Sequence, residues 1–252
     1  MANAPQQHLM TDGLILREYD SPSEADRFVA ILTRDKGLVR ASARGAKRPK
    51  SRFGSSTQPL CYSRLSLIPS RDKYIVEDAQ PNEVFFALRQ DVERLALGQY
   101  FCELALHLCP TDMPAPQHLR LLLGGLHYLA EGKKSPLLVK AVVEGRLLSL
   151  EGYMPDLTGC TVCGQPEAPL WFSPGSGTLS CSVHAGQGDA LEVSNGVLTA
   201  LRHILYGEFE RCFAFSLPES DVALLATLME RFLLAQTQHR FATLDFYHTL
   251  RG

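Results

Sequence analysis

The fold is decided by the stretch RFVAILTRDKGLVRASA, residues 27–43. It contains two short apolar segments, Arg27–Thr33 and Leu38–Ala43, joined by the turn sequence Arg34-Asp-Lys-Gly. Gly37 can adopt the positive φ that such a tight turn requires. Short β-prone runs on either side of a glycine turn are typical of a β-hairpin. The stretch therefore predicts two antiparallel strands.

Three further segments around this hairpin have the same character. They are Gly13–Tyr19, Ser63–Ile68 and Lys73–Asp78, and in the second of them Leu65 and Leu67 alternate with polar residues. Five short strands within about 70 residues are typical of a small closed barrel rather than a sandwich. We therefore expect residues 1–80 to form a small closed β-barrel domain.

The period of the apolar residues changes to a helical one after Asn82. Apolar side chains recur at steps of three and four from Val84 to Leu108, and again over 117–130 and 137–150. Ser194 is placed to cap another helix, and Pro218–Gln238 has the pattern of a last long helix. The chain is thus predicted to be an α+β multidomain protein. Its helical domain spans residues 81–151 and 192–252 and is interrupted by a Gly-, Pro- and Cys-rich insertion, residues 152–191.

Composition indicates an ordinary globular chain. Of its 252 residues, 45% are hydrophobic and 21% are charged, and the formal net charge is −2. No apolar run approaches the roughly 20 residues that span a bilayer, and the first residues lack the pattern of a secretory signal. We therefore expect a cytoplasmic protein, whose seven cysteines lie in a reducing compartment where metal binding is commoner than disulfide formation.

Positive charge is concentrated in the N-terminal third. Residues 1–80 have a net charge of +4 and the remainder −6, and the run Thr33–Gly54 contains only one acid, Asp35. A dense basic segment on a weakly acidic protein favours a polyanionic partner over a solvated face. Phe53 and Tyr62 are candidate surfaces for base stacking. The residues predicted to contact nucleic-acid phosphates are Arg34, Lys36, Arg40, Arg44, Lys47, Arg48, Lys50 and Arg52.

The insertion contains two pairs of metal-ligating residues. Cys160 and Cys163 are followed, after 17 residues, by Cys181 and His184. Two pairs with two-residue spacing, separated by a predicted hairpin, are typical of a zinc ribbon in which four protein ligands hold one structural zinc ion. Such a site has no open coordination position and would fold the insertion rather than catalyse a reaction. The alternative is a metal-free loop whose cysteines pack or oxidise. Buried packing positions are expected for the other cysteines, which are Cys61, Cys102, Cys109 and Cys212.

The sequence offers little sign of catalysis. No GxSxG, P-loop or GxGxxG motif is present. The acidic pairs Glu18/Asp20 and Glu24/Asp26 fit a solvated turn better than a catalytic dyad. The chain is therefore predicted not to be an enzyme. Besides a DNA-binding protein, two other functions remain open. One is a protein-interaction adaptor with incidental DNA affinity, and the other is an OB-fold RNA-binding accessory factor.

The order of these features resembles the RecO family of bacterial recombination mediators. The resemblance extends over most of the chain and is most specific in Arg44–Ser51, RGAKRPKS, and in the ribbon. It is also carried by DGLILR at 12–17, LTRDKGL at 32–38, YFCEL at 100–104 and GYMP at 152–155. One departure is His184, because family members with a ribbon usually have cysteine as the fourth ligand.

The resemblance implies a DNA repair function in the bacterial cytoplasm, in association with the nucleoid. An OB-fold would bind single- and double-stranded DNA and anneal complementary strands. The expected partners are RecR, the C-terminal tail of single-stranded-DNA-binding protein and, indirectly, RecA, which would be loaded on coated DNA. No covalent chemistry and no membrane partner are implied.

Overall fold

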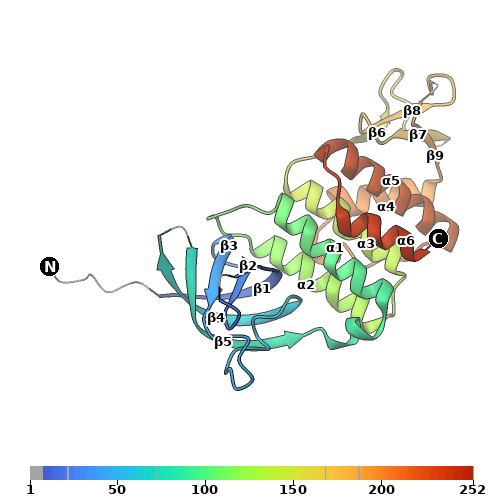
Figure 1. Cartoon of the computed structure of the whole chain (residues 1–252). Helices are drawn as coiled ribbons and strands as arrows, with labels where there is room; N and C mark the ends of the chain where they lie inside the picture. Colours follow the sequence, from blue (N-terminus) through green and yellow to red (C-terminus); the bar gives the residue numbers. More distant parts are fainter. Residues whose placement is uncertain (1–7, 22, 72, 168, 187, 252) are drawn as a thin grey trace. The chain divides into compact units, whose positions relative to one another are not determined.

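The computed structural model describes residues 8–21, 23–71, 73–167, 169–186 and 188–251 (Figure 1). The chain divides into two compact units, which are described separately. The first comprises the described residues up to Glu131 together with those from Phe241 onward, and the second comprises residues 132–240. No helix among the described residues is both long and apolar enough to cross a membrane.

The first unit contains a closed five-stranded barrel with the strand order β1-β2-β3-β5-β4. All neighbouring strands are antiparallel except β3 and β5, and β4 pairs back onto β1 to close the barrel. This is the arrangement of a Greek-key OB-fold, so the predicted fold class is confirmed. The strands are β1 (Leu9–Tyr19), β2 (Arg27–Thr33), β3 (Gly37–Ala43), β4 (Cys61–Ser70) and β5 (Lys73–Val84).

The β2–β3 hairpin forms as the sequence predicts. Gly37 has φ +59°, and a Cβ at this position would lie 2.1 Å from the carbonyl oxygen of Pro110. The next residue, Leu38, donates a backbone hydrogen bond to that same oxygen at 2.8 Å. Glycine is therefore required both by the turn and by the segment that packs against it.

Helices complete the first unit, and two predictions about them are wrong. The predicted helix does not begin near Val84, because β5 continues to that residue by pairing with Cys61 of β4. A short 3-10 helix η1 (Phe86–Gln90) follows, and Asp91 then caps α1 (Val92–Leu108) by accepting from the Arg94 N–H. The helix predicted over Pro218–Gln238 forms but is not the last one, because α6 (Ala242–Arg251) follows it. This last helix packs on α1 in the first unit, which also contains α2 (Pro116–Glu131).

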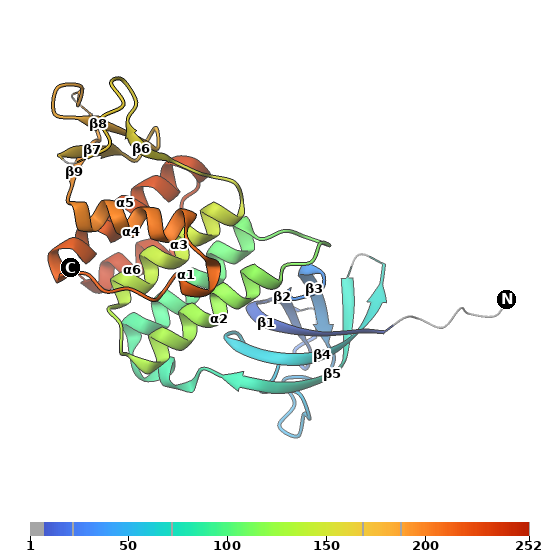
Figure 2. The same ribbon diagram turned by 180° about the vertical axis from the view of Figure 1, so that it is seen from behind.

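The second unit contains three packed helices, which Figure 2 shows from behind, and a small sheet. Ser194 caps α4 as predicted, by accepting from the Val197 N–H at 3.1 Å. Gly145 of α3 allows close helix packing, because a Cβ there would lie 2.8 Å from side-chain atoms of Ile204 and Met229. The helices are α3 (Pro136–Leu150), α4 (Asn195–Tyr206), the short η2 (Phe209–Arg211) and α5 (Glu219–Thr237).

The predicted hairpin of the insertion is the centre of this sheet. Its strands, β7 (Leu170–Ser173) and β8 (Thr178–Cys181), pair antiparallel. Two strands that the sequence did not indicate flank them, β6 (Asp156–Cys160) beside β8 and β9 (Leu191–Val193) beside β7.

Candidate nucleic-acid interface and metal centre

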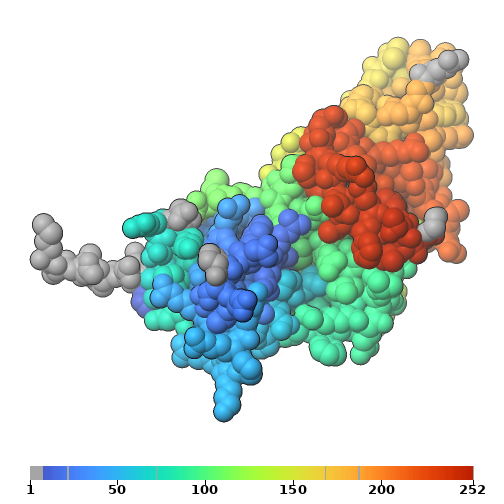
Figure 3. All heavy atoms as spheres, viewed as in Figure 1, coloured from blue at the N-terminus to red at the C-terminus, as the bar shows by residue number. Residues whose placement is uncertain are grey.

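All eight predicted phosphate-contacting side chains are exposed. Arg34 and Lys36 lie in the β2–β3 turn and Arg40 lies on β3, while the other five belong to the segment between β3 and β4. We call this segment, residues 44–60, the basic loop. It is the light-blue segment that extends away from the strands in Figure 1 and projects from the surface in Figure 3.

The base of the basic loop is fixed to the barrel. Ala46 and Phe53 are only 3% and 8% exposed and belong to the barrel core. Gly45, at φ +66°, donates its N–H to the Asp26 carboxylate at 2.7 Å. The prediction that Phe53 offers a face for stacking is therefore wrong, because its ring supports the loop from inside.

A buried arginine ties the far end of the basic loop to the same barrel. Arg27 on β2 donates to the Gly54 carbonyl at 2.6 Å and to the Thr57 hydroxyl at 2.8 Å, and it pairs with Glu18 at 2.8 Å. Lys47 of the loop contacts the other oxygen of Glu18 at 2.7 Å. Burial by itself would raise the pKa of Glu18, but the hydrogen bonds and charges of Lys47 and Arg27 together lower it.

The interpretation of these acids as a solvated face was therefore wrong for Glu18 and Asp26. Each holds part of the basic loop in place through a contact 19 or 29 residues away in sequence. Such pairings depend on the closed barrel, and nothing in the local sequence indicates them.

The structure separates the cations that are already engaged from those that are free. Arg34 is held by Asp12 and Asp35, both at 3.3 Å, and Arg52 donates to the Glu77 carbonyl at 2.9 Å. A hydrogen bond from Thr11, together with the adjacent Arg34, lowers the pKa of Asp35 and favours the ionised form of this carboxylate. Among the described residues, three cations of the basic loop have neither an ion pair nor a side-chain hydrogen bond, and these are Arg44, Arg48 and Lys50.

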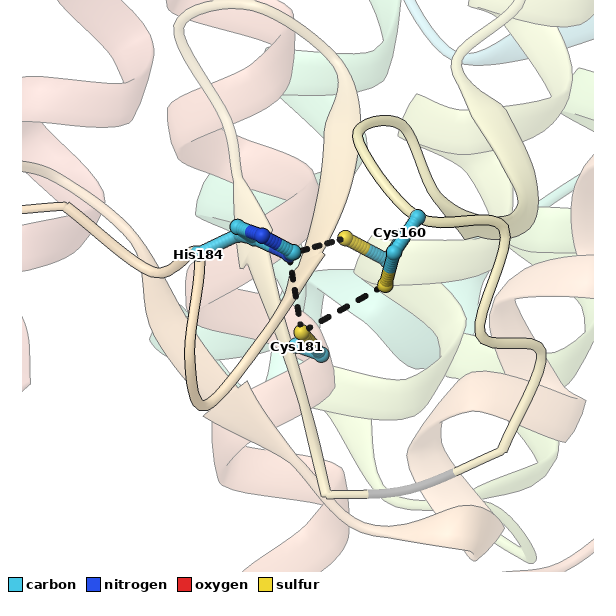
Figure 4. A group of neighbouring side chains, drawn as sticks. Cys160, Cys181 and His184 are labelled. Carbon is cyan, nitrogen blue, oxygen red and sulfur yellow. Dashed lines mark hydrogen bonds between the residues drawn. The ribbon is translucent and has the colours of Figure 1, made fainter.

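The second unit brings the four predicted metal ligands together. The ligand atoms of Cys160, Cys163, Cys181 and His184 all lie within 4.8 Å of one another. The His184 Nδ1 is 3.6 Å from the Cys160 sulfur and 3.2 Å from the Cys181 sulfur. Figure 4 draws these two contacts as dashed lines. The sulfurs of Cys163 and Cys181 are 3.7 Å apart. These residues form a cluster able to bind a metal ion.

The donor set and its spacing fit a tetrahedral zinc site. Zn–S bonds of about 2.3 Å at tetrahedral angles place sulfurs about 3.8 Å apart, close to the separation observed between Cys163 and Cys181. Gly164, at φ +75°, closes the first turn by donating to the Cys160 carbonyl. The backbone N–H of Cys163 lowers the pKa of the Cys160 thiol to about 5, which favours the thiolate that binds metals.

The four other cysteines have the packing role that the sequence predicts. All are buried. Complete burial raises the pKa of Cys102 to about 12, so this thiol stays protonated.

Comparison with known proteins gives the same answer for both halves of the chain. The family model "Recombination protein O N terminal" matches residues 7–85, and "Recombination protein O C terminal" matches residues 89–245. A protein named DNA repair protein RecO from Acetivibrio thermocellus is 33% identical over 245 residues, which cover 96% of this chain and 97% of that protein. Proteins of the same name from Symbiobacterium thermophilum and Desulforudis audaxviator are 32% identical over 246 residues and 41% identical over 172 residues. Since the two family models together span the barrel, the metal-ligand cluster and nearly all of the helices, the chain belongs to the RecO family.

Proposed function

We propose that this protein is a DNA-binding recombination mediator of DNA repair. Membership of the RecO family and the DNA repair role named for its relatives support the general function. The observation that supports DNA as the ligand is the anchored basic loop, which holds Arg44, Arg48 and Lys50 exposed and without acidic partners among the described residues.

The proposed mechanism is strand annealing by charge neutralisation. Lysine and arginine side chains that neutralise phosphates release condensed counterions and make binding strongly dependent on salt. The phosphate contacts belong to Arg44, Lys47, Arg48, Lys50 and Arg52, with Arg34, Lys36 and Arg40 extending the track. Two strands held on one positive surface repel each other less, so complementary bases can pair without any covalent step.

The proposed partners follow from the family. With RecR, the protein helps to load RecA on DNA coated by single-stranded-DNA-binding protein, whose C-terminal tail it binds. It acts in the bacterial cytoplasm at the nucleoid. The role proposed for the Cys160–His184 cluster is to hold one zinc ion that stabilises the β6–β9 sheet and takes no part in catalysis.

A charge-matched pair of variants tests the role of the loop. In the first, Arg44, Arg48 and Lys50 are all changed to Ala; in the second, the positive charges are kept by Arg44→Lys, Arg48→Lys and Lys50→Arg. Affinity for single-stranded DNA, duplex DNA and RNA is measured at several salt concentrations. For duplex DNA, the alanine variant is expected to lose about 0.9 from the slope of log K against log salt for each lost phosphate contact. The charge-keeping variant should retain the wild-type slope.

Two results would contradict the proposal. An unchanged slope in the alanine variant would show that the basic loop does not contact phosphates. A clear preference for RNA in the same competition would instead favour an RNA-binding accessory factor. The variant Arg120→Ala, which removes one exposed positive charge from α2, shows what the loss of a single charge outside the basic loop does to binding.

A further inference from the structure

Apart from the basic loop, the first unit has a surface that is both aromatic and basic, and it lies on the outer face of β1, β2 and β3. The rings of Tyr19 on β1 and Phe28 on β2 are directly opposite in the strand register, with centroids 6.0 Å apart and planes at 47°. Both side chains are only half-buried, whereas Val29, which follows Phe28 in β2, packs into the barrel core. This pair therefore presents aromatic surface to solvent.

A β-bulge creates this surface. Ile15 of β1 pairs with Ile31, but the register shifts before Arg17, which pairs with Ala30. In a strand without a bulge, Arg17 and Tyr19 would point into the barrel like Ile15, because alternate side chains share one face. The extra residue, Leu16, shifts this alternation, so both side chains point outward. Sequence periodicity alone therefore assigns both side chains to the wrong side of the barrel.

Exposed cations lie over both rings. The guanidinium carbon of Arg40 is 5.8 Å from the centroid of Tyr19, and the ammonium nitrogen of Lys73 is 5.6 Å from that of Phe28. A neighbouring hollow of about 520 Å³ is lined by Arg17, Tyr19 and Arg40, and by Tyr74 of β5. Asp112 is the one acid among its lining residues.

The surface is continuous with the basic loop. Along β3 the buried residues Val39, Ala41 and Ala43 alternate with Arg40 and Ser42, and the exposed Arg44 follows directly after the strand. Arg44 is the first residue of the basic loop. A chain that contacts phosphate-binding side chains in the loop can therefore continue along β3 to the rings.

We infer that Tyr19 and Phe28 form a base-stacking site for single-stranded DNA. The inference rests on the proposed function and adds a second kind of contact to it. Adjacent aromatic rings with cations beside them match the way non-specific single-strand binders hold successive bases. Duplex DNA keeps its bases stacked internally, so it can engage the cations but not the rings. Arg40 and Lys73 then move from the rings to the phosphates of the bound strand.

The test compares an oligothymidylate with an abasic strand of the same length, which has the phosphates but no bases. Binding is measured for the wild type, for Tyr19→Leu/Phe28→Leu, and for Tyr19→Phe, which keeps the ring. Wild type and Tyr19→Phe should bind oligothymidylate about 5- to 50-fold more tightly than the abasic strand, as expected for one or two stacked bases. The double leucine variant should lose that difference while its affinity for duplex DNA stays within about two-fold.

A crosslinking experiment with wild-type protein removes dependence on the variants. Oligothymidylate carrying 5-iodouracil should crosslink to peptides that contain Tyr19 or Phe28, and crosslinks confined to residues 44–60 would overturn the inference. Equal wild-type affinity for the two strands would also overturn it, while leaving phosphate binding by the loop intact. If neither strand binds, the proposed function and the stacking site both fail.

Discussion

A single buried side chain, Arg27, holds in place the segment whose cations are proposed to contact phosphates. Its guanidinium group is bound by one carboxylate, one backbone carbonyl and one hydroxyl, and two of these three partners belong to the basic loop. A planar group with several fixed donors suits this position, and lysine would satisfy fewer of the acceptors. The position of the basic loop therefore depends on a residue that makes no contact with DNA in the proposed mechanism.

We expect Arg27→Met to destabilise the protein by about 1–3 kcal/mol, because it leaves buried hydrogen-bonding groups without partners. DNA affinity should fall as well, since the loop loses its attachment at Gly54 and Thr57. Urea unfolding and a DNA titration measure the two effects. Arg27→Lys should recover part of the stability.

The free energy of unfolding at acidic pH provides a check on the ion pair between Arg27 and Glu18. Because the pKa of Glu18 is lowered in the folded state, its contribution is present above the unfolded value and is lost as the pH falls through the folded value. This loss begins near the ordinary pKa of 4.5 and should be smaller in Arg27→Met. An identical loss of stability at acidic pH in both proteins would contradict the pairing.

Among the elements, the module formed by the β6–β9 sheet combines short strands with the compact cluster of Cys160, Cys163, Cys181 and His184. Its four strands are three to five residues long, and each of the two ligand pairs lies at a turn beside this sheet. Elements this short cannot bury much apolar surface, so a bound ion would supply much of the module's stability. The ligand pairs could be predicted because their spacing is local. β6 and β9 could not, because such short strands form only beside a partner.

Removing the metal is expected to unfold the module and leave the barrel intact. Purified protein should contain about one zinc ion per chain, and treatment with a strong chelator should make Cys160, Cys163 and Cys181 react with iodoacetamide. Cys102 should stay unlabelled at pH 8, since burial raises its pKa to about 12. Labelling is mapped by mass spectrometry. His184→Cys should retain zinc and Cys160→Ser should lose it, and gently purified protein without metal would refute the site.

At the scale of the whole molecule, the chain returns to the unit in which it began. Residues of α6 pack on α1, with Phe241, Leu244 and Tyr247 buried there, and Thr243 donates its N–H to Glu103 at 2.9 Å. The sequence does not indicate this helix, because it is only ten residues long, half of them polar, and its partner lies about 140 residues upstream. The barrel was predictable because its turns and alternation are local, whereas the attachments between distant segments were not.

Truncation after Arg240 should therefore destabilise the first unit, although the removed segment is remote in sequence from the barrel. Loss of two buried aromatic side chains and one leucine is expected to cost more than about 4 kcal/mol. The double substitution Phe246→Ser/Leu250→Ser, on the exposed side of α6, serves as the control and should have little effect. Thermal unfolding of the full-length and truncated proteins gives the comparison, and equal midpoints would contradict this role of α6.

The return of α6 also sets the order of events during synthesis. Strands β1–β5 leave the ribosome first, but Tyr100 of α1 meets the ring of Phe241 only after the intervening residues have been translated. At about 5–20 residues per second, this interval lasts on the order of 7–28 s. During that time the part of α1 that packs on α6 stays uncovered in the nascent chain. The unit that contains the barrel is therefore the first to begin folding and the last to finish.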